Sequence, residues 1–283
     1  RAGFPKGCFT NLPIASAKVE SIIKNSKVKA VTLTGSKPAG SAVASVAGNE
    51  IKKSVLELGG SNALVVFEDC NMEEAVKTAV QARFQNTGQS CIAGKRLLLH
   101  KNIAEEFTQK FVEEVRKLKS GDPADEETFI GVMAREDLAE ELHEQLTKSV
   151  KQGAVILAGG KRDGAYFEPT VVTDVTPSMS IFKEETFGPV IGITTFKNED
   201  EAVYLVNSSN FGLGVSIFTE DFEKAKKLIP LFDDGAVFVN ELVKSDPRLP
   251  FGGTKISGYG RELSEDGIKE FVNKKTVYFN SYS

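Results

Sequence analysis

Hydrophobic and polar positions follow two different periods along this chain. Short apolar runs, bounded by turn residues, alternate with longer segments in which apolar residues recur every three to four positions. Short apolar runs are typical of buried strands, and the longer period is typical of helices with one apolar face. This alternation predicts an α/β fold, in which a parallel sheet is flanked by helices.

The predicted strands and helices cover most of the chain. The strands are expected at 30–33, 55–58, 97–99, 155–157, 170–173, 190–196, 215–218 and 236–239, with a β-prone tail at 276–279. The helices are expected at 39–47, 72–84, 103–118, 137–152, 200–206 and 222–229, and a short one follows the glycine-rich loop after 251.

Two of these helices carry a capping signal. Asn71 and Asn102 are each followed by a glutamate three residues later, Glu74 and Glu105. An asparagine at this spacing from a glutamate predicts a capped helix start. The second helix is expected to run to Leu118, with its stop signal at Gly121.

Composition and charge narrow the function classes. The chain has 283 residues, of which 41% are hydrophobic, which is enough for a substantial core and excludes a disordered chain. Its net charge of -4 lacks the basic excess of a nucleic-acid-binding protein. No apolar run approaches the roughly 18 to 20 residues that cross a bilayer. We therefore expect a cytoplasmic protein with neither nucleic acid nor a membrane as partner.

Cysteine and histidine are scarce. The three cysteines, Cys8, Cys70 and Cys91, cannot form a disulfide framework over this length. With His100 and His143 they show no zinc-ligand spacing, so no metal site is predicted. Any cysteine with a special role here is expected to act through its thiol chemistry.

Cys91 and Glu57 are the candidates for chemistry. Cys91 follows a glycine-containing turn after a long helix, where a thiol can face a cleft beside free N–H groups, although a buried, unreactive cysteine gives the same pattern. Glu57 ends an apolar run just before two glycines. Such a carboxylate is either a solvated strand end or a general base at the carboxyl edge of a sheet.

Three loops could hold a ligand. Gly35 and Gly40 flank a strand-to-helix turn with Ser36 between them, which suits a pyrophosphate but lacks the third glycine of the dinucleotide fingerprint. A plain turn into a packed helix has the same sequence. The loops 185–189 and 250–253 combine aromatic residues with glycines and either line a pocket or form simple turns.

Five segments in one order resemble a known family. They are LTGSKPAG, VLELGGSN, FQNTGQSCIAGKR, EETFGPV and PFGGTKISGYGRE. Together they resemble the NAD(P)-dependent aldehyde dehydrogenase superfamily over nearly the whole chain, and most closely its succinate-semialdehyde dehydrogenase branch. The resemblance implies oxidation of a short aldehyde, such as succinic semialdehyde, with NAD or NADP as cofactor.

The resemblance also implies a domain organisation. Residues 1–60 would be the second part of a Rossmann-like cofactor domain, 61–250 the catalytic domain, 251–272 a return to the cofactor domain and 273–283 an oligomerisation strand. In this family the first part of the cofactor domain, an oxyanion-hole asparagine and a ribose-binding lysine precede the segment where this chain begins. The fold is thus expected to be incomplete and the isolated chain to turn over little.

The family's roles transfer onto matching positions of this chain. Cys91 would attack the aldehyde to form a thiohemiacetal, whose oxyanion accepts a hydrogen bond from the Cys91 N–H, and Glu57 would activate the water that hydrolyses the thioester. The expected cofactor contacts are Thr34, Gly35, Ser36, Gly40, Leu58, Glu185 at the nicotinamide ribose and Phe187 at the ring.

Substrate and partner are implied in the same way. Phe251 would face the aldehyde tunnel, and Arg248 would bind a substrate carboxylate, although a surface ion pair is the alternative for Arg248. The tail strand implies a homo-oligomer, a dimer or tetramer. A contrasting hypothesis is a non-catalytic assembly module that keeps the fold and its interface.

Overall fold

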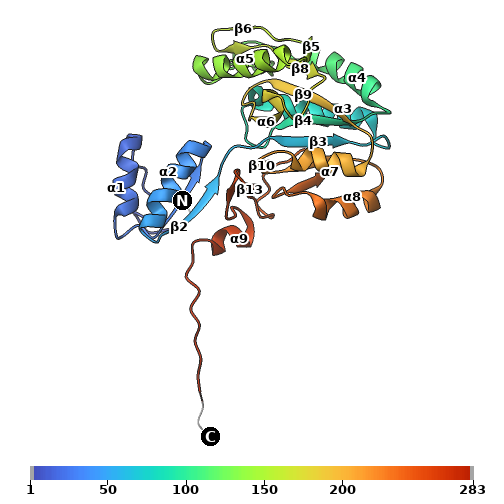
Figure 1. Ribbon diagram of the computed structural model, residues 1–283. Coiled ribbons are helices and arrows are strands. Elements are labelled where there is room, and N and C mark those ends of the chain that lie inside the picture. The colour runs from blue at the N-terminus through green and yellow to red at the C-terminus, as the bar shows by residue number, and fades with distance from the viewer. Residues whose placement is uncertain (1–2, 281–283) are drawn as a thin grey trace.

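The computed structural model describes residues 3–280. Figure 1 shows a larger lobe of stacked helices and strands, a smaller lobe built from the N-terminal segment, and an extended C-terminal segment that leaves the body. Each lobe is organised around its own sheet. Most of the functional residues predicted from the sequence lie near the segment that connects the two sheets.

The larger lobe contains a seven-stranded sheet in the order β12-β11-β3-β4-β9-β8-β5. Its strands are β3 (Asn62–Val66), β4 (Gly94–His100), β5 (Val155–Ala158), β8 (Thr170–Thr173), β9 (Val190–Phe196), β11 (Val215–Phe218) and β12 (Val237–Val239). Neighbouring strands run parallel, except for the antiparallel pair of β5 and β8. The predicted α/β class, with a parallel sheet, is confirmed.

Helices cover both faces of this sheet, and the alternating side chains of β3 show which helices pack on each face. Leu64 and Val66 belong to a core cluster with residues of α3 (Met72–Phe84) and α4 (Ala104–Arg116). Ala63 and Val65 point to the opposite face, because side chains alternate along a strand. They belong to a cluster with residues of α5 (Glu136–Lys151), α6 (Ser180–Lys183), α7 (Glu199–Asn207) and α8 (Phe222–Leu228). A sheet with both faces buried is typical of parallel α/β proteins.

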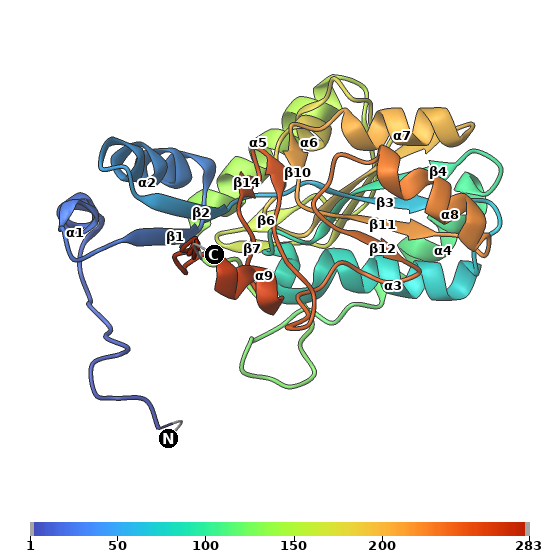
Figure 2. The ribbon, with the colours of Figure 1, turned by 90° about the horizontal axis from the view of Figure 1, so that it is seen from below.

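The smaller lobe has a three-stranded sheet. Parallel strands β1 (Ala30–Thr34) and β2 (Lys53–Glu57) are joined by α2 (Lys37–Asn49), and β14 (Gly258–Tyr259) pairs antiparallel with β2. The chain therefore returns to this lobe near its C-terminal end, as the view from below also shows (Figure 2).

Short elements complete the described chain. They are η1 (Ser16–Lys18), α1 (Val19–Lys24), η2 (Gln85–Gly88), the hairpin β6 (Arg162–Asp163) and β7 (Tyr166–Phe167), η3 (Ile229–Leu231), the pair β10 (Phe211–Gly212) and β13 (Thr254–Lys255), and α9 (Ser264–Lys269). Among residues 3–280, none of the helices has the length and apolarity that spanning a bilayer requires.

A central strand, β3, was not predicted from the sequence. Its first residue is Asn62, which follows two glycines and a serine and therefore resembles part of a turn. In the fold, Asn62 is buried and both ends of its amide are bonded: Nδ2 donates to the Ile92 carbonyl and Oδ1 accepts from the Gly214 N–H. These partners come from distant segments, so a turn-forming residue can begin a buried strand.

The two capping predictions had different outcomes. The Asn71 side chain accepts from the Glu74 N–H, so the predicted cap of α3 is confirmed. The predicted cap at Asn102 is wrong, because its amide donates to Glu68 and α4 begins at Ala104 after an N-cap, Ile103, that makes no side-chain bond.

The predicted end of α4 near Gly121 is also wrong. The helix ends at Arg116, because the following segment bonds to a distant one: the N–H groups of Phe129 and Ile130 donate to the Lys119 carbonyl, and Gly121 donates back to Ile130. These bonds replace those that would continue the helix.

The β-prone tail at 276–279 forms no strand within residues 3–280. Val277, Tyr278 and Phe279 are instead exposed in the extended segment that leads away from the body (Figure 1). A β-strand needs a neighbouring strand for its main-chain hydrogen bonds, and the described part of the chain offers none at this place.

Candidate functional site

The candidate site lies where the chain crosses from the smaller sheet to the larger one. β2 ends at Glu57 and β3 begins at Asn62, so residues 58–61 form the crossing. The Gly35 N–H, just after β1, donates to the Glu57 carbonyl at 2.9 Å. The predicted cofactor turn and the predicted base are therefore joined through the main chain.

The Glu57 carboxyl group is buried, with 2% of the residue exposed. Neither of its oxygens has a hydrogen-bond partner within residues 3–280. Burial raises the pKa of Glu57 to about 8, with a further contribution from the like charge of Glu262, whereas Arg261 acts in the opposite direction. Such a carboxyl can exchange a proton near neutral pH, which is what a general base requires.

Cys91 lies in a turn between η2 and β4 and is partly exposed. Asn86, Thr87 and Gly88 all have positive φ angles, 53°, 54° and 70°, which reverse the chain after α3. Burial raises the pKa of the Cys91 thiol, Glu185 and Glu57 act in the same direction, and Lys95 opposes them. The thiol therefore stands among two carboxyl groups and one ammonium.

The other two cysteines differ in their surroundings. Cys8 is exposed, and the pKa of Cys70 is raised to about 11 by burial and by the negative charge of Asp69. Neither was predicted to be catalytic. A nearby cation thus distinguishes Cys91 from Cys70.

Lys95 connects the segments that carry Glu57 and Cys91. Its Nζ lies 2.6 Å from the Gly60 carbonyl, 2.8 Å from the Ser90 carbonyl and 3.0 Å from the Cys91 carbonyl. It also lies 2.9 Å from Oε1 of Glu185. The Lys95 ammonium thereby joins the crossing segment, the cysteine turn and the loop of Glu185.

Lys95 was missed in the sequence analysis. It sits in β4, the strand that leads away from Cys91, where all seven residues are buried. A charged residue inside an apolar run is the signal that could have found it, because a buried lysine needs buried acceptors.

Two glycines allow the crossing segment to approach the site. A Cβ atom on Gly59 would lie 2.1 Å from Oε2 of Glu185, and one on Gly60 would lie 2.5 Å from the Cys91 carbonyl oxygen. The Gly60 N–H also donates to Oε1 of Glu185 at 3.0 Å. The two glycines of Glu-Leu-Gly-Gly are therefore required by their close approach to Glu185 and Cys91.

The predicted pyrophosphate turn is exposed beside this crossing. Thr34, Gly35 and Ser36 lie on the surface, and the Ser36 side chain caps α2 by accepting from the Ala39 N–H. A Cβ on Gly35 would meet only Leu33, at 3.9 Å, so the space over this turn is open. An exposed helix start offers N–H groups and a positive dipole end, which fits an anionic group such as a pyrophosphate.

Gly40 and Leu58 are placed on the inner side of the same turn. A Cβ on Gly40 would lie 2.6 Å from a Leu58 methyl carbon, so this glycine lets α2 pack closely on the residue after β2. Leu58 is buried, and its N–H donates to the Ser257 carbonyl. Gly40 and Leu58 therefore support the turn from its buried side.

Glu185 and Phe187 lie on the opposite side of the crossing. Glu185 is partly exposed and bonded to Lys95 and Gly60, and the Phe187 ring is 37% exposed with the Lys95 ammonium 5.9 Å from its centroid. The structure therefore brings Cys91, Glu57 and Glu185 to one place, with Phe187 at its edge.

The residues predicted to bind the substrate are less closely connected to the other site residues. Phe251 is half-buried and forms a two-way main-chain bridge with Glu262, the residue that adds a like charge to Glu57. Arg248 lies on the surface with its guanidinium paired to both carboxylate oxygens of Asp246, which is the ion pair given above as its alternative. Among residues 3–280, the side-chain hydrogen bonds of Arg248 go to Asp246 and none goes to another predicted site residue.

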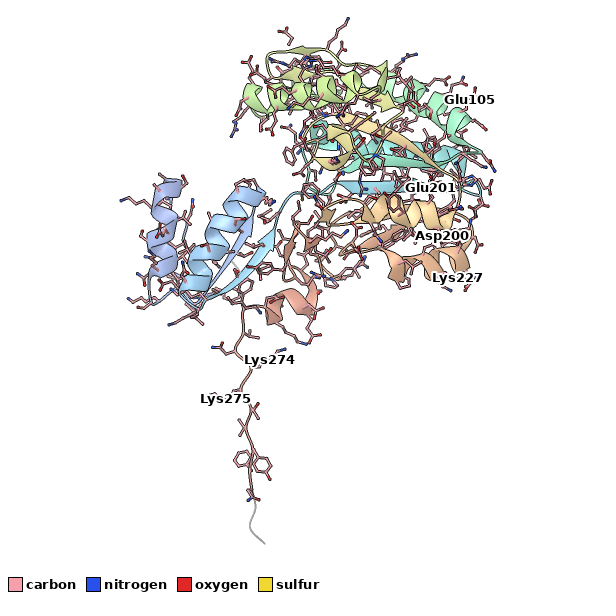
Figure 3. The ribbon with its side chains drawn as sticks, viewed as in Figure 1. Glu105, Asp200, Glu201, Lys227, Lys274 and Lys275 are labelled. Atoms are coloured by element: carbon pink, nitrogen blue, oxygen red, sulfur yellow. The ribbon has the colours of Figure 1, made fainter. Side chains whose placement is uncertain are left out.

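Metal ligands do not cluster in the described residues. Within residues 3–280, no group of three histidine, cysteine, aspartate or glutamate side chains is arranged to hold a metal ion. Of the charged side chains labelled in Figure 3, Glu105, Glu201 and Lys227 lie at the end of the larger lobe that faces away from the smaller lobe, and Lys274 and Lys275 lie on the extended tail. The charged groups at the candidate site are therefore the carboxyl groups and the ammonium that were described above as neighbours of the thiol.

Comparison with known proteins identifies the family. The sequence profile of the aldehyde dehydrogenase family matches residues 1–277, nearly the whole chain. The chain belongs to the aldehyde dehydrogenase family. Among curated members, the succinate-semialdehyde dehydrogenase (NADP+) 1 of Mycobacterium tuberculosis is 47% identical over 281 residues, which cover 98% of this chain and 62% of that protein.

Solved structures of family members share the fold. The succinic semialdehyde dehydrogenase of Streptococcus pyogenes, in complex with NADP+, superimposes with a TM-score of 0.92 at 34% identity, covering 95% of this chain and 60% of that one. The NAD-dependent aldehyde dehydrogenase of Sinorhizobium meliloti gives a TM-score of 0.87 at 38% identity, covering 89% and 51%. The chain thus spans about 60% of the length of the curated relatives that it matches.

Proposed function

We propose that the protein to which this chain belongs oxidises an aldehyde to the carboxylic acid with NAD(P)+, with Cys91 as nucleophile and Glu57 as general base. The observation that carries the proposal is the meeting of a buried, unpartnered carboxyl group and a thiol turn at one crossing segment. A titratable group with a strongly shifted pKa beside a nucleophile is typical of a catalytic site.

The proposed reaction begins at the sulfur of Cys91. The thiolate attacks the aldehyde carbon, and the resulting oxyanion accepts a hydrogen bond from the Cys91 N–H. The thiohemiacetal would then lose a hydride, for which bound NAD(P)+ would supply the acceptor, and a thioester would remain on Cys91. Glu57 then takes a proton from water, which attacks the thioester and releases the carboxylic acid and the Cys91 thiolate.

The cofactor is proposed to lie between the exposed turn and Glu185. Thr34, Gly35 and Ser36 would face the pyrophosphate, and Glu185 would accept hydrogen bonds from the nicotinamide ribose, with Phe187 beside the ring. The relatives support either cofactor, since one is named for NADP+, another is solved with NADP+ and a third is named NAD-dependent.

The proposed substrate is a short aldehyde such as succinic semialdehyde. The names of the relatives from Mycobacterium tuberculosis and Streptococcus pyogenes support this choice. Phe251 is proposed to line the path of the aldehyde, and Arg248 to bind its carboxylate after release from Asp246. We further propose that the protein works as a homo-oligomer, and the exposed apolar side chains of Val277, Tyr278 and Phe279 support this.

Two measurements test the proposed function. Iodoacetamide labelling, followed by mass spectrometry, compares the alkylation rates of Cys91 and Cys70 in the folded chain. We expect Cys91 to react faster, because both thiols are partly exposed but only that of Cys91 has a cation, Lys95, among the groups that lower its pKa within residues 3–280.

The second measurement is turnover itself. Mixing the protein to which this chain belongs with succinic semialdehyde and NADP+ should produce reduced cofactor, and Cys91→Ser should abolish the absorbance change. A Cys91 no more reactive than Cys70, together with no reduced cofactor from any short aldehyde, would instead favour the non-catalytic assembly module.

A further inference from the structure

Lys95 is a fully buried ammonium group with four oxygen atoms around it. Its side chain is 0% exposed, and all four acceptors lie within 3.0 Å of Nζ. Burying a charge is costly unless it is paired and hydrogen-bonded. A buried lysine with three carbonyl acceptors and one carboxylate therefore points to a specific task at this place.

The acceptors come from the three segments that make up the proposed site. The Ser90 and Cys91 carbonyls belong to the nucleophile's turn, and the Gly60 carbonyl lies three residues after the proposed base. The carboxylate is that of Glu185, the proposed ribose ligand. The Lys95 side chain thus connects the turn that carries the Cys91 thiol to the segments that carry the proposed base and the proposed ribose ligand.

The charges around the thiol are few and can be named. Glu57 and Glu185 raise the pKa of Cys91, and Lys95 is the cation that lowers it. Arg83 is buried in α3, and its Nη2 donates to the Thr186 carbonyl. Its positive charge lowers the pKa of Lys95, and the carboxylate of Glu185 opposes the lowering of the Arg83 pKa by burial. The pKa of Lys95 is itself lowered to about 8 by burial, against the opposing effect of Glu185, so the group is still mostly charged at pH 7.

We propose that Lys95 is a positioning residue of this site: its ammonium holds the Cys91 turn against the crossing segment and stabilises the Cys91 thiolate. This inference rests on the proposed function, in which Cys91 is the nucleophile. A purely structural Lys95, which only neutralises Glu185 inside the protein, would affect folding but not the ionisation of Cys91.

The test measures the ionisation of Cys91 through its alkylation. In a Cys8→Ser, Cys70→Ala background, the iodoacetamide rate is recorded against pH for Lys95→Met, Lys95→Gln and Lys95→Arg. Methionine removes charge and donors, glutamine keeps donors without charge, and arginine keeps the charge. Lys224→Met is the matched control, because it removes another largely buried lysine, paired with Asp69 away from Cys91.

The expected result separates charge from packing. Loss of an opposite charge moves a pKa by about one unit or more, so Lys95→Met and Lys95→Gln should react about tenfold more slowly at pH 7. The difference should shrink above about pH 8, where Lys95 loses its own proton. Lys95→Arg should keep most of the rate, and Lys224→Met should match the background.

Each result of the alkylation test either supports the inference or overturns it. An alkylation profile unchanged in folded Lys95→Met or Lys95→Gln overturns it and leaves the proposed function standing. A Cys91 as inert as Cys70 in the unmodified chain overturns both. If circular dichroism shows that neither neutral variant folds, Lys95→Arg decides: arginine keeps its charge above pH 8, where Lys95 loses its proton, so the alkylation rate of this variant relative to the background should rise between pH 7 and pH 9, and a constant ratio overturns the inference.

Discussion

At the scale of single residues, burial gives the site its chemistry. Glu57 is an ordinary carboxylic acid that the fold places out of water without a hydrogen-bond partner within residues 3–280. Burial disfavours its charged form, so the pKa rises from 4.5 to about 8. The pKa of Cys91 is shifted in the same direction for the same reason, and the nearby ammonium of Lys95 works against this shift, as does the N–H of Ile92.

Glu57→Gln should separate the two halves of the proposed reaction. Glutamine keeps the shape of the side chain but cannot take a proton from water, and losing a general base typically costs about 10²- to 10⁴-fold in rate. We expect thioester hydrolysis to slow much more than acylation, seen as a burst of reduced cofactor followed by a slow steady state. Deacylation at the original rate would remove Glu57 from the role of base.

The same residue predicts how stability changes with pH. Between about pH 4.5 and pH 8 the unfolded chain releases the Glu57 proton while the folded chain keeps it. The folded state then binds more protons, so this group's contribution to the free energy of unfolding falls as pH rises through that window and is constant above it. Thermal melts of Glu57→Gln should show a smaller loss of Tm across this range than the unmodified chain. Parallel melting curves would contradict the shifted pKa.

At the scale of elements, the site depends on how closely segments approach. The crossing between β2 and β3 passes the Cys91 turn at a distance that leaves no room for a Cβ on Gly60. The turn at Cys91 is shaped by three consecutive positive φ angles at the end of α3. Strand ends and a helix end, rather than whole elements, therefore define the site.

Gly60→Ala should disturb this approach. The new methyl group would lie 2.5 Å from the Cys91 carbonyl oxygen, so the segments must move apart. Overpacking of this kind typically costs about 1 to 3 kcal/mol, which chemical denaturation can measure. We also expect slower alkylation of Cys91, because its turn loses its contact with Lys95.

Gly48→Ala is the matched control for that substitution. Gly48 lies near the end of α2, and a Cβ there would meet nothing within 4 Å. Alanine favours a helix over glycine by roughly 0.5 to 1 kcal/mol, so this variant should be slightly more stable than the unmodified chain. Equal losses in both variants would mean that close approach at Gly60 is not the cause.

At the scale of the whole molecule, the two lobes differ in how well their sheets are enclosed. The larger sheet is covered by helices on both faces, whereas in residues 3–280 β1 pairs only with β2 and leaves its other edge open. Exposed strand edges and exposed apolar side chains favour association with another chain. The extended tail, with Lys274 and Lys275 before its apolar residues, adds a second such surface (Figure 3).

We expect the chain to self-associate through these surfaces. Replacing Val277 and Phe279 with serine removes apolar area that is already exposed, so the fold should be unaffected while the associated fraction falls. Analytical ultracentrifugation over a range of concentrations measures this fraction. An unchanged sedimentation profile would show that the tail takes no part.

The sequence by itself determined those elements whose pattern is local. The strands 170–173, 190–196 and 215–218 agree with β8, β9 and β11 residue for residue, and Asn71 caps α3 as predicted. An apolar run between turn residues needs no distant partner to be recognised, whereas the asparagine–glutamate spacing failed at Asn102, whose amide donates to Glu68, 34 residues away. The motifs around Cys91 and Glu57 were found in the same way.

Only the tertiary structure decided what depends on distant partners. The strand β3, the order of the sheet and the place of Lys95 could not be read along the chain, because Asn62 is satisfied by segments 30 and 152 residues away and Lys95 by one 90 residues away. Hydrogen bonds to buried polar groups and close approaches at glycine are fixed by packing between segments. The sequence therefore supplied the reactive groups, and the packing of the fold set their distances, their burial and their charges.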